Sequence, residues 1–374
     1  MKHAPLILCI AVLCVILTLG LWPFHAPGND VAWLKNRDGI RFGYPGTAIG
    51  TGSIHPAGSA DPRSCSVEIW LLAARADQEG TALTLYLPNG PSRFALHQSL
   101  SDLELQSGKS RRHHFYVNDV FRRDRPVFIT ITSAVSGTAV YGNGKLLRMV
   151  RGFQVAPCAG RLIVGDSPWQ QDPWSGQVRG LAIYASELAP PAVLRHYDSW
   201  TNTGRPEAAK PEQAVALYRF DERAGDIVHN RAQPGVDLVM PAGYRVQDKL
   251  FLEPFWEEFE LSWSFVKGVL KNIVGFVPLG FCFYAYFTAS CKIRRAALAT
   301  ILVGFTVSLT IEVLQGYLPT RDSGTTDLIT NTLGTWIGVA LYQAGTARFQ
   351  SHSRLAAAAI KWRGDIRTRS DFPR

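Results

Sequence analysis

The feature that most constrains this chain is the uneven placement of its apolar residues. Long uncharged stretches lie near both ends, whereas the middle is polar and punctuated by glycine and proline. The run from Pro5 to Trp22 follows Lys2 and His3, a pattern typical of a membrane-spanning helix or a signal peptide. An uncleaved anchor is favoured, because the run is longer than a usual signal core and no small-x-small cleavage site follows. A cleaved signal is the alternative.

Three further apolar stretches predict membrane-spanning helices at residues 272–288, 296–318 and 326–344. The loop at residues 290–295 is basic, and so is the tail after residue 344. Because basic loops tend to stay in the cytoplasm, the four spans predict a multi-pass protein of the cytoplasmic (inner) membrane. Both termini are then cytoplasmic, and residues 25–260 are extracytoplasmic.

Shifts in composition divide the chain into six segments. They are an N-terminal transmembrane anchor (1–24), an extracytoplasmic sandwich (25–200), an extra strand and linker (201–254), an interfacial segment (255–271), a helical membrane domain (272–345) and a basic cytoplasmic tail (346–374). The predicted fold class is a multidomain membrane protein, in which an all-β sandwich joins an α-helical transmembrane domain with four transmembrane helices in total.

The sandwich is predicted from short alternating apolar stretches bounded by glycine, proline, asparagine and aspartate. Asn143 and Gly144 separate two such stretches and predict a tight hairpin, because Asn-Gly supplies two positive φ angles. Cys65 and Cys158 are the only cysteines of this region, and an oxidising compartment would permit a disulfide between them. Two separate buried thiols are the alternative, because spacing alone does not give the distance between the Cα atoms.

Residues 174–184 and the stretch 191–200 resemble the end of laminin G-like and concanavalin A-like jelly rolls. The resemblance covers most of residues 31–200 and implies a jelly-roll sandwich that binds a glycan or a protein, with calcium binding left open. Trp169 and Trp174 are candidates for stacking on sugars, and core packing is the alternative role. Residues 214–225 look like the opening strand of such folds. Here they follow the closing strand, so they predict an extra strand that pairs back onto the sandwich.

Glycan hydrolysis by the sandwich is not expected. A glycosidase needs two carboxyl groups that flank the scissile bond. The acidic residues of this region are scattered singly among turns, where such side chains are usually solvated.

The apolar C-terminal helices carry a set of polar residues that we call the polar cluster: Asn272, Glu312, Gln315, Arg321, Asp322, Asp327 and Asn331. Residues three or four apart share a helix face, so Glu312 lies beside Gln315 and Asp327 beside Asn331. An ionisable side chain that faces lipid costs on the order of 3 kcal/mol, so the cluster is expected to converge on a common interior. Arg321 is expected to hold one of the carboxylates of Glu312, Asp322 or Asp327. We interpret the cluster as a binding or catalytic site, with hydrogen bonding between helices as the structural alternative.

The blocks 272–280, 311–315, 321–322 and 327–334, in this order and spacing, closely resemble the VanZ-like family of membrane proteins over about residues 270–345. In this chain the N-terminal anchor takes the place of the usual first helix, with the sandwich inserted after it. The resemblance implies a role in the cell envelope, because VanZ-like proteins are associated with low-level resistance to glycopeptide antibiotics such as teicoplanin. Gly334 and Gly338 have the spacing of helix-packing residues, and a homodimer through them is a further expectation.

The leading functional hypothesis is a VanZ-like cell-envelope protein whose sandwich binds an extracytoplasmic glycan or protein, with a link to envelope polysaccharide or to the glycopeptide response. One alternative is a membrane-embedded hydrolase or transferase that acts on a lipid-linked or polysaccharide substrate and uses Glu312 or Asp327 as acid or base. Another is an adhesion or scaffold module with a membrane anchor.

Enzymatic activity is not favoured by the sequence. No standard catalytic motif occurs, and none of the 9 histidines lies in the polar cluster. No cofactor, metal site or nucleic-acid partner is predicted, and the expected surroundings are a lipid bilayer and an envelope glycan or protein.

Overall fold

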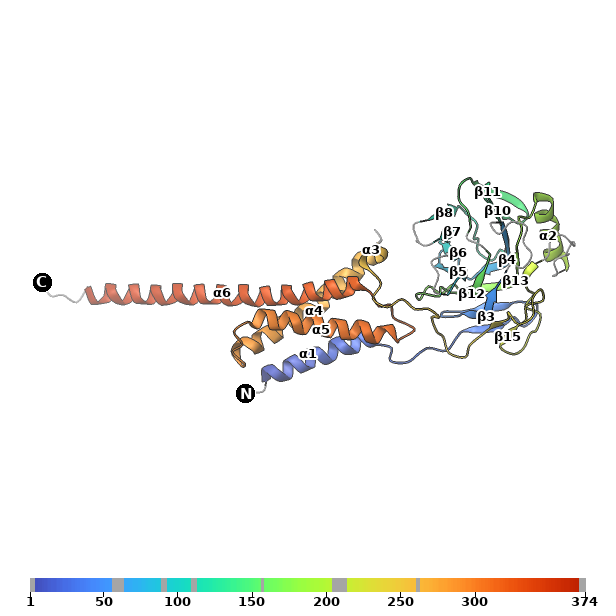
Figure 1. The fold of residues 1–374 in the computed structure, drawn as a ribbon. Helices are drawn as coiled ribbons and strands as arrows, with labels where there is room; N and C mark the ends of the chain where they lie inside the picture. The colour runs from blue at the N-terminus through green and yellow to red at the C-terminus, as the bar shows by residue number, and fades with distance from the viewer. Residues whose placement is uncertain are drawn as a thin grey trace. The chain divides into compact units, whose positions relative to one another are not determined.

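The computed structural model describes residues 4–55, 64–88, 93–108, 113–155, 158–203, 214–259 and 263–369. The chain forms two compact units, and each is described by itself. The sandwich unit comprises residues His25–Lys249, and the helical unit comprises Met1–Phe24 together with Leu250–Arg374. Figure 1 shows the elements of both units.

The sandwich unit consists of two antiparallel sheets. The first sheet has the order β1-β2-β13-β4-β9-β10-β11, and β14 also pairs with β13. Its strands are β1 (Val31–Trp33), β2 (Ile40–Phe42), β4 (Cys65–Ala73), β9 (Val127–Ala134), β10 (Gly137–Gly142), β11 (Lys145–Val150), β13 (Gly176–Tyr184) and β14 (Ala214–Tyr218). β14 is the extra strand that the sequence predicts, and its Tyr218 lies opposite Leu181 of β13.

The second sheet has the order β15-β16-β3-β12-β5-β6-β7-β8. Its strands are β3 (Ala48–Ile54), β5 (Glu79–Tyr86), β6 (Arg93–Ser99), β7 (Asp102–Gly108), β8 (His114–Val117), β12 (Gly160–Val164), β15 (Ile227–Val228) and β16 (Leu238–Val239). Several neighbours in both sheets are far apart in sequence, as in a jelly roll. The predicted all-β sandwich is therefore confirmed.

Alternation along the strands builds the core between the sheets. In β4, the side chains of Val67, Ile69 and Leu71 are buried in this core, while the intervening residues point to the outer face. The β10–β11 hairpin turns at Asn143 and Gly144, whose φ angles are 52° and 75°. Both angles are positive, as the predicted Asn-Gly turn requires.

Helix α2 (Pro190–Thr203) covers part of the outer face of the first sheet, where it forms a second apolar cluster. Glu68 of β4 lies fully buried in this layer. Its carboxylate accepts hydrogen bonds from Tyr184 Oη at 2.9 Å and Trp200 Nε1 at 3.3 Å, and its other oxygen contacts His196 Nδ1 at 2.9 Å. The sequence predicted that acidic residues of this region are solvated in turns. Glu68 is an exception, because it is buried in a strand and its carboxylate contacts His196 and Trp200 of α2.

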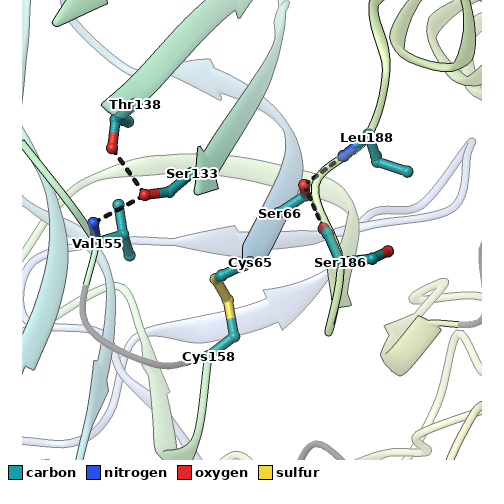
Figure 2. The surroundings of a disulfide bond; sticks show 8 residues. All are labelled: Cys65, Ser66, Ser133, Thr138, Val155, Cys158, Ser186 and Leu188. Atoms are coloured by element: carbon teal, nitrogen blue, oxygen red, sulfur yellow. Dashed lines mark hydrogen bonds between the residues drawn. A yellow bond between two sulfur atoms is a disulfide. The ribbon is translucent and has the colours of Figure 1, made fainter. Parts of the chain in front are cut away.

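Cys65 and Cys158 form a disulfide, with 5.6 Å between their Cα atoms (Figure 2). Cys65 begins β4 of the first sheet, and Cys158 precedes β12 of the second. Nearby, Ser133 Oγ accepts hydrogen bonds from Thr138 Oγ1 and from the amide of Val155. The disulfide therefore ties the two sheets together across the core.

The helical unit contains α1 (Ala4–Leu21), α3 (Phe255–Glu258), α4 (Trp263–Ala289), α5 (Ala296–Gly316) and α6 (Thr325–Arg369). In Figure 1, α1, α4, α5 and the first part of α6 lie side by side. Ile16 of α1 packs against Phe276 and Leu279 of α4 and Ile311 of α5. The N-terminal helix is thus an integral part of this unit.

Within the described residues, three helices are long and apolar enough to cross a membrane: α1, α4 over Phe265–Ala289, and α5. The predicted fourth span lies in α6, which does not end near residue 344 but continues as a helix to Arg369. The predicted basic tail therefore starts as part of α6, and its last residues, 370–374, lie outside the described residues.

Candidate functional site: the polar cluster of the helical unit

One face of α5 carries small and polar residues at every fourth position. Thr300, Ser308 and Glu312 are buried, and Gly304 is buried between them. The opposite face carries exposed apolar side chains, including Leu298, Leu302 and Phe305. Because a lipid-facing helix surface is apolar and polar groups turn inward, α5 has its polar stripe facing the other helices.

Helix α6 meets this stripe and α4 through two hydrogen-bonded pairs. Asn331 Nδ2 donates to Ser308 Oγ of α5 at 3.0 Å, and Asn272 Nδ2 of α4 donates to Asp327 Oδ1 at 2.7 Å. Ser308 is a partner that the sequence analysis missed. Its spacing of four residues before Glu312 on the same face was the available signal.

Glu312 is 1% exposed. Its Oε2 accepts a hydrogen bond from the backbone N–H of Gly324 at 2.8 Å. Gly324 lies in the loop that enters α6, so the carboxylate holds this loop against the end of α5.

Two other members of the cluster bind α1. Gln315 Nε2 donates to the carbonyl of Gly20 at 2.8 Å. Arg321 Nε donates to the carbonyl of Trp22 at 2.8 Å, and its guanidinium also reaches the carbonyl of Leu19 at 3.4 Å. The last carbonyls of a helix have no partner within it, so Gln315 and Arg321 cap the C-terminal end of α1. The pairing of Arg321 with a carboxylate stays a prediction, and Asp322 beside it is exposed.

The polar cluster thus gathers at one end of the helical unit, and its hydrogen bonds join several segments of that unit. The hydrogen bonds described above join five pairs of segments: α4 to α6, α5 to α6, α5 to the loop before α6, α1 to the end of α5, and α1 to the loop before α6. This arrangement is the one expected of polar residues that hold apolar helices together. It favours the structural interpretation of the cluster over a catalytic one.

Gly334 and Gly338 lie in the contact between α6 and α4. A Cβ atom added to Gly334 would lie 2.2 Å from the carbonyl oxygen of Ile273, and one added to Gly338 would lie 2.2 Å from that of Val277. The two glycines therefore let the helix backbones approach within the chain. The face predicted to form a homodimer is occupied by α4, so a dimer would have to use another surface.

The two sugar-stacking candidates of the sandwich unit differ in burial. Trp174 is fully buried in the core, where its Nε1 donates to Gln98 Oε1 at 2.7 Å, so the predicted stacking role of Trp174 is wrong. Trp169 is half-buried and packs edge-on against Tyr86, with 5.4 Å between ring centroids. Only Trp169 keeps a surface for a ligand.

Asp166 of the sandwich unit is a buried carboxylate that the sequence analysis did not single out. It is 1% exposed and accepts hydrogen bonds from Tyr244 Oη at 2.5 Å and from the amides of Ser167 and Asp172. Burial raises its pKa to about 7, against the opposing effect of these hydrogen bonds. Asp166 follows the end of β12, whereas Glu68 lies within β4 beneath α2, and the two carboxylates have different partners. This arrangement does not resemble the carboxylate pair of a glycosidase.

No group of three or more histidine, cysteine, aspartate or glutamate side chains that could hold a metal ion is found in the part of the chain that the structure describes.

Residues 222–346 match the VanZ/LLP1 family model. The VanZ-like region predicted from the sequence is confirmed, and the matched range begins earlier than expected, within the last part of the sandwich unit. No curated protein matches the chain.

Solved structures that are similar to the chain include two bacterial proteins and one animal protein. A putative carbohydrate binding protein from Bacteroides ovatus has 13% identity and a TM-score of 0.37, and the match covers 53% of this chain and 58% of that protein. The IT-sialidase CBM40 of Ruminococcus gnavus, bound to alpha2,3 sialyllactose, has 11% identity and a TM-score of 0.32, with 42% and 95% covered. A SAP-like pentraxin from Limulus polyphemus has 14% identity and a TM-score of 0.34, with 57% and 95% covered. At these identities and TM-scores the likeness does not extend to a ligand.

Proposed function

We propose that this chain is a cell-envelope membrane protein that displays a glycan-binding sandwich on the extracytoplasmic side, held at both ends by a VanZ-like helical unit. The observation that carries the proposal is that both connections to the sandwich start at one end of the helical unit. Trp22 is bound by Arg321. The backbone N–H of Glu253 donates to the carbonyl of Ser323 at 2.9 Å. The backbone N–H of Thr325 donates to the carbonyl of Glu253, also at 2.9 Å.

The loop before α6 therefore binds the chain at two points. It binds Trp22, where the chain leaves α1 toward the sandwich, and Glu253, where the chain returns from the sandwich. A domain held at two neighbouring points of a membrane unit is suited to presenting a binding surface outside the bilayer. The disulfide between Cys65 and Cys158 supports an oxidising, extracytoplasmic location for the sandwich. Glycan as the ligand is supported by the resemblance to laminin G-like domains.

The proposal includes a fourth membrane-spanning helix at the start of α6, besides the three that are long and apolar enough to cross a membrane. The start of α6 carries exposed apolar residues, including Ile329, Leu333 and Trp336, while Asp327 and Asn331 of the same helix bind α4 and α5. The inward polar residues lower the mean hydropathy of α6 without making its outer face polar. The proposed topology places both termini and the loop at residues 290–295 in the cytoplasm.

Reporter fusions test the topology. Alkaline phosphatase, which folds only outside the cytoplasm, should be active when inserted after residue 249 and inactive in the loop at residues 290–295 or at the C-terminus. Activity at the C-terminus with inactivity after residue 249 would contradict the proposal.

A glycan array tests the binding activity. The full-length protein in neutral-lipid nanodiscs, with and without calcium, should retain a restricted set of envelope glycans. Trp169→Ala should weaken this binding, because the half-buried ring of Trp169 keeps a surface for a sugar, whereas Trp256→Ala, the matched change in the helical unit, should not. Failure of the folded protein to bind any glycan would leave the adhesion or scaffold function through a protein partner.

The link to glycopeptide response is a separate part of the proposal and is supported by the VanZ-like resemblance. Deletion of the chain in its host should raise susceptibility to teicoplanin, and the full-length chain should restore the original susceptibility. An unchanged inhibitory concentration would remove this link and leave the binding proposal in place.

A further inference from the structure

The outer face of the first sheet is only partly covered by α2. Along β4, Glu68 is sealed beneath α2, Trp70 is partly buried beside it, and Leu72 lines a cavity of about 430 Å³. Sites for small ligands usually measure about 300 to 1,000 Å³. The uncovered end of this face is therefore large enough to receive part of a ligand.

The cavity has an excess of positive charge. Its lining includes the cations Lys35, Arg37 and Arg179, the amides Asn36 and Gln177, and a single carboxylate, Asp124. We call this site the basic pocket. Asp124 forms an exposed ion pair with Arg123 at 3.5 Å, and three cations line the pocket against this one carboxylate.

Arg179 is placed in the basic pocket by an irregularity of the sheet. Val178 lies opposite Leu71 and Gly180 lies opposite Trp70, so Arg179 is the extra residue of a bulge. Bulges redirect a side chain and occur frequently next to functional sites. The guanidinium lies over the Trp70 ring at 5.4 Å from its centroid, which fixes the plane of the group.

The cations of the pocket lack carboxylate partners among the described residues, because nearby acids bind other cations. Asp38, next to Arg37 in sequence, binds Arg223 at 2.8 Å. Arg179 hydrogen bonds to the neutral side chain of Gln177 at 3.2 Å, and its buried Nε has no hydrogen-bond partner in the described structure. Burial and the charge of Arg37 lower the pKa of Arg179, which indicates that the two cations repel each other.

We infer that the basic pocket binds the anionic group of an acidic saccharide, with the guanidinium of Arg179 and the charges of Arg37 and Lys35 facing a carboxylate or sulfate. The amides of Asn36 and Gln177 provide hydrogen-bond donors and acceptors for adjacent hydroxyl groups. An anion would relieve the repulsion between the cations and form charge-assisted hydrogen bonds. This inference rests on the proposed glycan-binding function and specifies the ligand class and the site of its anionic group.

The test uses the full-length protein in phosphatidylcholine nanodiscs at low ionic strength. Oligogalacturonate is compared with a neutral galacto-oligosaccharide of equal length, and dextran sulfate is compared with dextran. These pairs separate a carboxylate ligand from a sulfate ligand. Each acidic saccharide that fits should bind more tightly than its neutral partner, and added salt should weaken this binding.

Arg37→Gln and Arg179→Gln should each weaken binding of the acidic saccharide about tenfold or more, because each removes one charge-assisted interaction. Arg75→Gln is the matched control, since Arg75 is an exposed arginine that pairs with Asp77, and it should bind as the wild type does. Arg179 lies in a strand, so Arg179→Gln could disturb the sheet. Arg37 is exposed, so Arg37→Gln should leave the fold unchanged and tests the pocket independently. Thermal unfolding of each variant verifies the fold.

Glycan binding that ignores the acidic group and both pocket variants would overturn the basic pocket and leave the proposed function intact. Binding of poly-glutamate but of no saccharide would overturn the saccharide ligand in favour of an acidic protein partner. No binding of any of these probes by the folded protein would overturn the basic pocket, and the glycan array then decides separately whether the proposed function is also wrong.

Discussion

Removal of the disulfide should destabilise the sandwich unit by an amount that follows from its position in the chain. Cys65 and Cys158 are separated by 93 residues. In the chain-entropy model, opening a loop of that length costs about 4.6 kcal/mol of unfolding free energy at 25 °C. Both residues are buried, so alanine is a better replacement than serine, which would add a buried hydroxyl group.

The assay is thermal and urea unfolding of the full-length Cys65→Ala/Cys158→Ala variant in detergent, followed by the fluorescence of buried tryptophans such as Trp174. For a domain of this size each 1 kcal/mol lowers Tm by roughly 2 to 4 °C, so Tm should fall by roughly 10 °C or more. A reductant should lower the Tm of the wild type in the same direction and leave the double variant unchanged.

Cys14→Ala and Cys291→Ala provide the control. Both residues are exposed free cysteines of the helical unit, so their replacement should not shift the unfolding of the sandwich. A loss of less than about 1 kcal/mol in the double variant would refute the loop-closure argument, since the loop length requires several times more. Equal Tm values for the reduced and the oxidised wild type would also refute the loop-closure argument.

Three further predictions concern single residues. Gly334→Ala should destabilise the helical unit by about 1 to 3 kcal/mol through overpacking, because the added Cβ would lie 2.2 Å from a carbonyl oxygen of α4. Gly345→Ala is the control and should be tolerated, because its added Cβ has no neighbour within 4 Å. Unfolding in sodium dodecyl sulfate compares the two variants. Glu312→Ala should cost about 1 to 3 kcal/mol by leaving the buried amide of Gly324 without its acceptor, and Glu312→Gln, which keeps an oxygen, should restore most of this loss in the same assay. The pKa of Asp166 is raised to about 7, so the folded sandwich binds this proton more tightly than the unfolded chain, and its stability should fall as the pH rises from about 4 to about 7. Asp166→Asn should flatten that part of the Tm profile, and an unchanged pH dependence would show that the Asp166 proton is not linked to folding.

Much of the fold could be predicted from local patterns in the sequence. The Asn143-Gly144 turn was predictable because the required φ angles belong to these two residue types. The apolar runs predicted α1, α4 and α5 because length and hydropathy are properties of one segment. The boundary of α6 was missed, since a helix can continue through a change from apolar to basic composition.

The polar cluster was predictable only as a set of residues. Helical spacing placed Glu312 beside Gln315, but it did not reveal that the first holds the loop before α6 and the second caps α1. Trp169 and Trp174 illustrate the same limit: they lie in the same polar segment, yet one is half-buried and the other is sealed in the core.

The sequence by itself determined that the middle of the chain is an all-β sandwich, which helices are apolar enough for a membrane, and which part is VanZ-like. The tertiary structure alone decided the partners of the polar residues and the place of α1. Arg321 and the carbonyl of Trp22 are 299 residues apart, and no local periodicity relates them. The basic pocket likewise depends on a bulge at Arg179 and on Arg37 from a distant loop. Local periodicity reports which face of an element is apolar, whereas the choice of partner depends on the packing of all the elements together.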